Sequence, residues 1–447
     1  MILIRVFFHI SILSPLRLSP ALDTLQKGRP HNKIQLERAR VSREYYEEEQ
    51  KPKPLPKEFV LALKDVVTGE RVGITYTVRR LTDTDSARCP FQPQINEKGD
   101  VLWNTRSCIF LYGGKDIKSL GKGFHYLHNV RMNNKGQVVW AGKKMHLGDD
   151  EIFFYDGRKV RQLTNNKHSD GSPSINDHGE VVWSGFDGKD VEIFLYDGSN
   201  IIQLTDDTDC HNNPEINNRG EVVWEMNSKR EDSEIFFYDG QGVEVLTNNS
   251  VYDYSPQIND QGKVVWFSRV GTEGRDRDDE ILIYDGKDVV WLTDNKRRER
   301  NVQINNRGQA VWEEHDGHDW EIFFDNGKTV IQLTDNDIDD VTPQINDEGE
   351  IVWCGAGRAL QCGRKIERQI FFYNGKVVMQ LTEEAEDVYD NVHPHINNRG
   401  NIVWSGDYGS GYDIFLATKN LDLFESAFPG DEDKIKATDI IGRKLPL

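Results

Sequence analysis

Three aspartates at alternate positions, Asp335, Asp337 and Asp339, form a short motif with chemical potential. A hard cation such as calcium takes several oxygen ligands from a short bend of chain, and alternating carboxylates can supply them. The segment lacks the glycine at the sixth position and the glutamate at the twelfth that an EF-hand loop contains. Two interpretations stay open, a calcium site or a solvated acidic loop that keeps the protein soluble.

Motifs for hydrolytic chemistry are absent from the sequence. There is no Gly-x-Ser-x-Gly, which a serine hydrolase of the α/β type uses, and no His-Glu-x-x-His, which many zinc peptidases use. His315 and His318 lie three residues apart without an evident third ligand, so we expect them to be solvated loop residues. The sequence therefore predicts no catalytic residue and, calcium aside, no cofactor.

An internal repeat of about 43 residues must position these loops. Asn-x-x-Gly followed by a short apolar run ending in tryptophan occurs eight times, at steps of 37 to 51 residues. Eight of the ten tryptophans occupy this slot: Trp103, Trp140, Trp183, Trp224, Trp266, Trp312, Trp353 and Trp404. Most repeats continue with a segment like Glu151 to Gly157 (EIFFYDG) and a short run ending in Leu-Thr, as at Leu163-Thr164.

Turn chemistry predicts four short antiparallel strands in each repeat. Asn-x-x-Gly suits a tight turn between the first and second strands. Asp156-Gly157 and its equivalents are type I′ hairpin signals between the third and fourth strands. Such a unit is one propeller blade. We therefore predict an all-β fold, a single closed β-propeller of about eight four-stranded blades, with seven as the alternative.

The ends of the array predict how the ring closes. The eighth repeat has three strands (Ile396 to Ala417) and no Leu-Thr strand, whereas a spare strand, Tyr76 to Thr82, precedes the first repeat. Pairing the two would remove open sheet edges, so we expect the N-terminal strand to complete the last blade. An extra hairpin is expected over Phe59 to Gly73.

The predicted domains follow from the limits of the array. Residues 1–22 are either a secretory signal peptide or a disordered extension, and residues 23–58 form a charged linker. The propeller covers residues 59–417, and residues 418–447 form a C-terminal tail.

The meander predicts two unlike faces. The short turns within each hairpin lie on one face, and the longer loops, between the second and third strands and between successive repeats, lie on the other. Variable loops on a rigid scaffold usually carry binding, so we expect the binding face there. Its acidic candidates are Asp187, Asp190, Asp207, Asp209, Asp278, Asp316 and Asp319. A mixed polar set near the axis precedes the isoleucine or methionine of each first strand: Gln94, Arg131, Ser174, Glu215, Gln257, Gln303, Gln344 and His395.

The repeat resembles the TolB-type, WD-like β-propeller repeat, for example in Ser172 to Trp183 (SPSINDHGEVVW) with Glu192 to Gly198 (EIFLYDG). The resemblance spans Tyr76 to Ala417. It implies a propeller of the kind found in periplasmic and secreted proteins, in docking scaffolds, and ahead of dipeptidyl-peptidase-type hydrolase domains. Asn-x-x-Gly replaces the usual Ser-Pro-Asp-Gly, and the 30 residues after Ala417 are too few for a hydrolase domain, so we do not expect peptidase activity.

Charge and cysteine content narrow the partners. The net charge of -19 repels phosphate backbones, which excludes nucleic acid as an expected partner, and no apolar run is long enough to span a membrane. Disulfides Cys89–Cys108 and Cys354–Cys362 are compatible with the layout and would indicate an oxidising compartment. We expect a monomer in the periplasm or outside the cell, with the cytoplasm as the alternative.

Two functions are consistent with these features. The first is a non-catalytic scaffold that docks a protein, peptide or glycan on the acidic long-loop face. The alternative is a propeller enzyme, such as a metal-dependent lyase or hydrolase, that acts near the axial channel. The sequence favours the first, because the polar set near the axis forms no recognisable metal or acid/base constellation.

Overall fold

The computed structural model describes most of the chain between residues 58 and 420. The described ranges are 58–64, 66, 69, 71–83, 91–121, 123–144, 148–227, 232–270, 278–356, 368–382, 390–407 and 411–420. Contacts divide the chain into Met1–Leu55 and Pro56–Leu447. The predicted signal or extension, almost all of the charged linker, and the tail beyond residue 420 lie outside the described residues.

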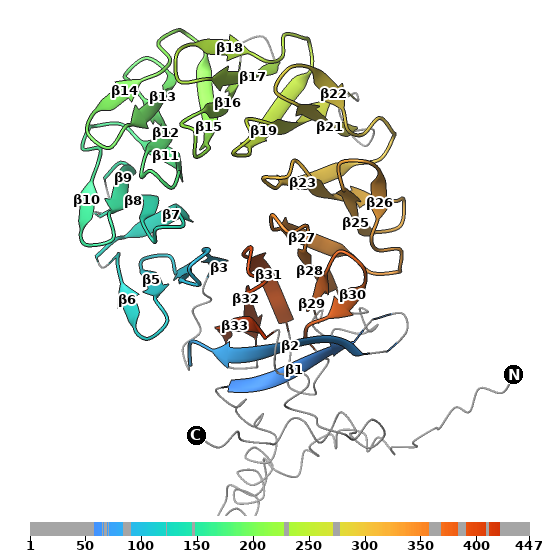
Figure 1. Cartoon of the computed structure of the whole chain (residues 1–447). Coiled ribbons are helices and arrows are strands. Elements are labelled where there is room, and N and C mark those ends of the chain that lie inside the picture. Colours follow the sequence, from blue (N-terminus) through green and yellow to red (C-terminus); the bar gives the residue numbers. More distant parts are fainter. Residues whose placement is uncertain are drawn as a thin grey trace, which may run out of the picture. The chain divides into compact units, whose positions relative to one another are not determined.

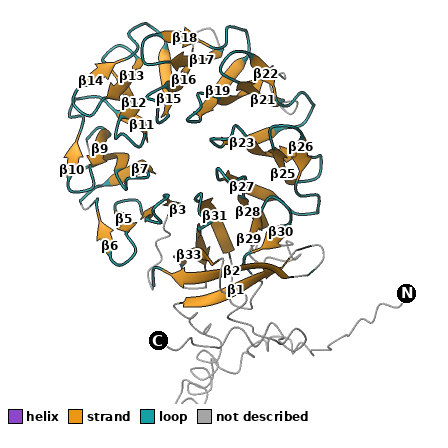
Figure 2. Cartoon of the chain, viewed as in Figure 1, coloured by secondary structure: helices purple, strands orange, loops and turns teal. Residues whose placement is uncertain are grey.

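The described residues form 33 β-strands and no helix (Figure 2), so no described helix could cross a membrane. Ahead of the repeats lie β1 (Glu58–Lys64) and β2 (Arg71–Arg80). The repeats comprise, in order, β3 (Phe91–Ile95), β4 (Val101–Asn104), β5 (Ile109–Tyr112) and β6 (Ile117–Ser119); β7 (Tyr126–Met132), β8 (Val138–Lys143), β9 (Glu151–Tyr155) and β10 (Val160–Gln162); β11 (Asp170–Ile175), β12 (Val181–Phe186), β13 (Val191–Tyr196) and β14 (Ile201–Gln203); β15 (Cys210–Ile216), β16 (Val222–Asn227), β17 (Ser233–Tyr238) and β18 (Val243–Val245); β19 (Tyr252–Ile258), β20 (Val264–Arg269), β21 (Asp279–Tyr284) and β22 (Val289–Trp291); β23 (Glu299–Ile304), β24 (Ala310–His315), β25 (Trp320–Asp325) and β26 (Val330–Gln332); β27 (Asp340–Ile345), β28 (Ile351–Ala356), β29 (Arg368–Tyr373) and β30 (Val378–Gln380); and β31 (Asp390–Ile396), β32 (Ile402–Asp407) and β33 (Tyr412–Asn420).

Each of repeats one to seven folds into four antiparallel strands, as the turn signals predict. Within the unit Pro56–Leu447, these sheets follow one another around a common axis, with the first strand of each innermost and the fourth outermost (Figure 1). The fourth and fifth repeats share one parallel bridge, Ser233 to Tyr252, which joins their strands into one eight-stranded sheet.

The N-terminal strand pairs with the last repeat. β2 runs antiparallel to β33, with Thr77 opposite Thr418 and Val78 opposite Ala417, so the predicted pairing is confirmed. β1 pairs with the other edge of β2, which gives a five-stranded sheet, β1-β2-β33-β32-β31. The sequence suggested a separate hairpin followed by a closing strand. Instead, β2 serves both purposes, pairing with β1 through residues 71–79 and with β33 through residues 75–80.

The core lies between neighbouring sheets. Seven of the eight repeat tryptophans stack on a phenylalanine of the adjacent strand, with ring centroids 5.5 to 6.1 Å apart and interplanar angles of 16 to 23°. Seven of the repeat tryptophans, all except Trp404, also share a core cluster with apolar residues of a neighbouring repeat. Trp103 of the first repeat packs in one cluster with Val403 and Ile414 of the eighth. Apolar packing therefore extends between neighbouring repeats, and residues of the first and eighth repeats share one cluster.

The turn between the third and fourth strands differs from the prediction. A two-residue type I′ turn would pair Tyr155 with Arg158, but Tyr155 pairs with Val160 and leaves a four-residue loop. The reason is the side chain of Asp156, whose Oδ1 accepts the backbone N–H groups of Arg158 and Lys159 at 2.9 Å each. An aspartate that caps the turn in this way favours the longer loop.

Every first strand contains a bulge. The register shifts within it, and each repeat has a non-glycine residue there with φ between 35 and 56°: Gln92, Asn129, Ser172, Asn213, Ser255, Asn301, Thr342 and His393. Such a conformation costs about 1–2 kcal/mol per residue, so other contacts must hold it. Glu313 supplies two of them, accepting the Asn301 side-chain amide and the Thr342 backbone N–H, both at 2.6 Å.

Candidate functional site

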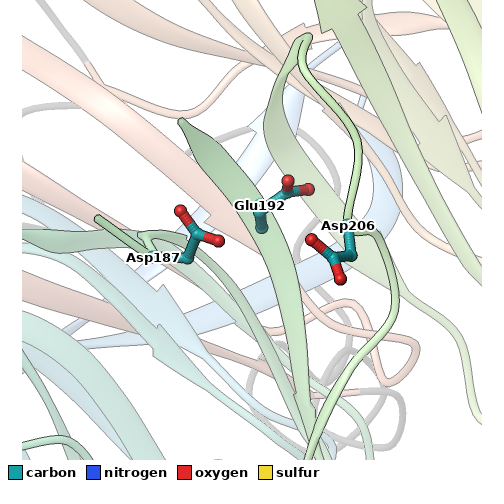
Figure 3. A group of neighbouring side chains, drawn as sticks. All are labelled: Asp187, Glu192 and Asp206. Atoms are coloured by element: carbon teal, nitrogen blue, oxygen red, sulfur yellow. The ribbon is translucent and has the colours of Figure 1, made fainter. Parts of the chain in front are cut away.

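In the third repeat, two loops that were predicted to share a face lie close together. We call the loops between second and third strands and between successive repeats the loop face. In the third repeat, Asp187 of the β12–β13 turn, Glu192 of β13 and Asp206 of the loop after β14 gather around one space (Figure 3). One oxygen from each carboxylate lies within 4.8 Å of the others. The arrangement offers oxygen ligands from two loops and one strand.

Burial and hydrogen bonding set these carboxylates apart. Backbone N–H groups of Lys189 and Asp190 donate to Asp187 and lower the pKa of its carboxyl group. Glu192 is fully buried, and burial, together with the neighbouring Asp190 and Asp207, raises its pKa to about 7 although Thr205 donates to it. Lys189 lies 3.6 Å from Asp206 and partly balances the negative charge.

A second carboxylate group lies at the same place in the sixth repeat. Asp316, Asp319 and Glu321 bring one oxygen each within 4.8 Å of one another. The predicted calcium residues Asp335, Asp337 and Asp339 lie in the next loop, with exposed side chains, and Asp339 accepts the backbone N–H of Trp320 at 3.2 Å. The loop carrying the aspartate motif therefore lies beside this group.

Trp320 lies at the centre of that region. It is one of the two tryptophans outside the repeated core slot, and it is half-buried at the start of β25. The Arg300 guanidinium lies 3.7 Å from its ring centroid, and the His315 ring meets it edge-on at 5.3 Å. Arg300 also bonds to the fully buried Glu313, which fixes the guanidinium against the indole.

The remaining predicted residues, Asp207, Asp209 and Asp278, lie in two loops of the loop face. Asp207 pairs with the buried His211 at 3.1 Å, and its Oδ1 accepts the backbone N–H of Asp209. Burial and neighbouring carboxylates raise the pKa of Asp278. The face is not uniformly acidic, because the loop before β23 carries Lys296-Arg297-Arg298, of which Arg297 pairs with Glu314 at 2.8 Å.

The opposite, short-turn face carries a belt of eight asparagines. The side-chain Nδ2 of each asparagine donates to the backbone carbonyl of the next, at 2.8 to 3.3 Å, and the last, Asn397, donates to the first, Asn96. In chain order they are Asn96, Asn133, Asn176, Asn217, Asn259, Asn305, Asn346 and Asn397. The sequence predicted these residues from turn geometry alone. Their amides also connect each repeat to its neighbour.

A second series lies one residue further along, where carboxylates and amides alternate. The backbone N–H of each member donates to a side-chain oxygen of the next, and the N–H of the last member, Asn398, donates to Glu97, the first. In chain order the members are Glu97, Asn134, Asp177, Asn218, Asp260, Asn306, Asp347 and Asn398. The Nδ2 groups of Asn218 and Asn306 each bridge two flanking aspartates, at 2.9 to 3.3 Å. We call this series the carboxylate–amide ring.

The two series line an axial cavity of about 310 Å³. Burial and the charges of Asp347 and Asp177, each two places away in the ring, raise the pKa of Glu97, although the Asn398 backbone N–H donates to it. Deeper along the axis, Arg131 lies 3.3 Å from Glu215, which also accepts the Ser174 hydroxyl at 2.7 Å. Residues of the predicted axial polar set from three repeats therefore meet. Sequence reasoning missed the carboxylate–amide ring, although the alternation after each turn asparagine would have revealed it.

Buried carboxylates of the inner strands make stability depend on pH. Glu299 at the start of β23 is 3% exposed, and burial together with Glu280 raises its pKa to about 9. The unfolded state loses this proton near the ordinary glutamate pKa of 4.5, whereas the folded state keeps it up to about pH 9. The contribution of Glu299 to the free energy of unfolding therefore falls as the pH rises from 4.5 to about 9. We expect Glu299→Gln to flatten that decline, measured by urea unfolding across the window. An unchanged slope would contradict the assignment.

The cysteine predictions fall partly outside the described residues. Cys89 and Cys362 are not described, so neither predicted disulfide can be placed. Cys354 is buried, its Sγ lies 3.3 Å from the carbonyl oxygen of Asn391, and burial raises the pKa of its thiol to about 12. This thiol fills the interface between the seventh and eighth repeats.

Comparisons with known proteins reveal similarity of fold only. No protein-family model matches the chain, and no curated protein matches it in sequence. Among solved structures, Porphyromonas gingivalis dipeptidyl peptidase 4 is similar at 12% identity and a TM-score of 0.52, over 73% of this chain and 56% of that one. The β-propeller domain of the Pyrococcus furiosus trilobed protease is similar at 12% identity and a TM-score of 0.46, over 73% of this chain and 99% of that one. A putative TolB from Agrobacterium tumefaciens is similar at 18% identity and a TM-score of 0.35, over 53% of this chain and 88% of that one. The antiparallel four-stranded sheets and the likeness to the dipeptidyl peptidase support a β-propeller fold and leave the activity open.

Proposed function

We propose that this chain is a non-catalytic propeller scaffold that binds a protein or peptide partner on its loop face. The observation that carries the proposal is Trp320, a half-buried indole held between Arg300 and His315. Tryptophan and arginine are enriched at the positions that dominate binding energy, and here contacts already order both side chains. An anchor fixed before binding loses little conformational entropy on association.

Charge around the anchor defines the partner. Asp316, Asp319, Asp337 and Asp339 surround the turn that precedes Trp320 and the loop that contacts it. Opposite charge across an interface speeds association and rejects acidic competitors. We therefore propose a partner segment with basic side chains beside an apolar or aromatic residue.

Binding to defined immobilised peptides of basic, neutral and acidic composition tests the proposal. We expect the basic peptides to be retained, and Trp320→Ala to weaken that binding by about thirtyfold, the loss for an anchor worth about 2 kcal/mol. The matched control is Trp291→Ala, because Trp291 is the other tryptophan outside the core slot and lies 51% exposed on the outer strand β22. Equal loss in both variants, retention of acidic peptides, or retention of oligosaccharides alone would contradict the proposal.

We also propose that the eight repeats form one closed ring of eight blades. Its support is the pairing of β2 with β33 and the two series of hydrogen bonds that return from the eighth repeat to the first. The carboxylate–amide ring adds a parity argument. Alternation of acid and amide can close only on an even number of repeats, since an odd number would place two like side chains together. Eight satisfies this condition, and the alternative of seven does not.

A further inference from the structure

The carboxylate group of the sixth repeat differs from its counterparts in other repeats. In the fifth repeat, Arg269 at the end of β20 lies opposite Asp279, and their side chains pair at 3.0 Å. In the second repeat, Lys143 lies 3.7 Å from Asp150. The corresponding pair in the sixth repeat is His315 opposite Trp320, two rings in contact. An aromatic pair has replaced a cation–carboxylate pair.

After this replacement, the basic side chains that act on Asp316 are two histidines, His315 and His318. Among the ion pairs of the described residues, none involves Asp316, Asp319 or Glu321. Glu321 is fully buried and Asp319 is 9% exposed. Transferring carboxylates from water into such surroundings is costly unless a positive charge or hydrogen-bond donors compensate.

Asp319 shows that the compensation is incomplete. Its Oδ1 is buried and has no hydrogen-bond partner. Burial, then Asp316, Asp339 and Asp337, raise the pKa of its carboxyl group, so four acidic groups act on one another around this atom. In the third repeat, which has the same Asp-Gly-x-Asp-x-Glu sequence, the equivalent Oδ1 of Asp190 also lacks a partner. The equivalent Oδ1 of Asp278 in the fifth repeat lacks a partner too, but there Arg269 pairs with the adjoining Asp279. Among the described residues, the sixth repeat has no such pair beside Asp319, which points to a missing positive ligand.

We propose that Asp316, Asp319 and Glu321 bind a calcium ion on the loop face, with Asp337 and Asp339 adding negative charge from the adjoining loop. All three ligand atoms are carboxylate oxygens, which suit calcium or magnesium, and zinc prefers nitrogen and sulfur. Two ligands come from a turn with a glycine at its tip, Gly317 (φ 111°), and an irregular shell of carboxylates and water favours calcium over the strict octahedron of magnesium. The ligand set differs from the Asp335, Asp337 and Asp339 motif that the sequence suggested. It does not depend on the proposed peptide binding.

Terbium luminescence provides a direct test, because Trp320 lies between two ligands in the sequence and can transfer excitation to a bound lanthanide. With the full chain, we expect saturable terbium emission that calcium displaces and magnesium displaces poorly. Asp319→Asn should weaken terbium and calcium binding by at least about tenfold, since changes even to groups outside the ligand shell cost that much. Asp150→Asn, in the second repeat where Lys143 is present, should leave both unchanged.

Thermal melting with calcium or chelator supplies a second readout. Calcium should raise the melting temperature of the wild type and should not raise that of Asp319→Asn. It should also raise the melting temperature of Trp320→Phe, because this variant keeps the ligands and loses only most of the sensitised terbium emission. Asp319→Asn should fold, because it removes an uncompensated buried charge. Calcium stabilisation that persists in Asp319→Asn, or terbium emission equal in wild type and Asp319→Asn, would overturn the site. Repeating the peptide-binding experiment in the presence of chelator tests the two proposals separately. If only the calcium proposal is wrong, the peptides are still bound.

Discussion

Replacing Tyr76 by alanine is expected to lower the free energy of unfolding by about 3–5 kcal/mol, the usual cost of truncating a large buried aromatic residue. Tyr76 lies on β2, before the first repeat, yet it is fully buried among residues of the last two. Its hydroxyl donates to the Gly400 carbonyl at 3.0 Å, and its ring meets Phe372 edge-on at 6.1 Å. A residue at the start of the array thus completes the core at its end.

Chemical unfolding of two control variants separates packing from local effects. Tyr76→Phe removes only the hydroxyl group and should cost about 1 kcal/mol. Arg79→Ala, three residues along the same strand with a side chain 46% exposed, should cost no more than about 1 kcal/mol. If Tyr76→Ala were no more harmful than Arg79→Ala, β2 would not be part of the core.

Asn305→Asp is expected to destabilise the protein by about 1–3 kcal/mol, although aspartate is as good a turn former as asparagine. The aspartate keeps Oδ1, which accepts the backbone N–H groups of Arg307 and Gln309. It loses Nδ2, which donates to Gln309 Oε1 at 2.9 Å and to the Asn346 carbonyl at 2.8 Å. The side chain is buried, so a carboxylate oxygen would face these acceptors with no donor between them.

Asn326→Asp in the same repeat is the matched control. Asn326 caps the turn between β25 and β26 by accepting the backbone N–H groups of Lys328 and Thr329. The equivalent residue in earlier repeats is aspartate, as at Asp156 and Asp285, so this change should be close to neutral in urea unfolding. Equal effects at Asn305 and Asn326 would mean that the belt asparagines are turn residues only.

Much of the fold could be predicted because the repeat carries its own turn and core signals eight times. Asn-x-x-Gly and the tryptophan slot placed the strands of every repeat, and the spare strand near Tyr76 indicated its partner near Ala417. The hairpin at Asp156 was predicted too short, because a dipeptide signal does not reveal that the side chain caps a longer loop. The strands and their partners were thus easier to predict than the length of the turns that join them.

Contacts between repeats explain what could not be predicted. The carboxylate–amide ring depends on the second residue of each turn, which looks like variable surface until the repeats are placed side by side. The sequence predicted that the acidic loops share one face, but which carboxylates meet depends on the bend of each loop. Asp316 and Asp319 thus gather with Glu321, a strand residue that the sequence suggested only as part of the repeat. The sequence did not single out Trp320, because its contacts with Arg300 and His315 come from other strands.

Amide hydrogen exchange of residues 75–80 tests the closed ring most directly. If β2 is hydrogen-bonded along β33, these amides should exchange as slowly as those of β32 in the same sheet, and fully only when the protein unfolds globally. Exchange at the rate of an unstructured peptide, with β32 still protected, would mean that the N-terminal strand is detached and the ring open.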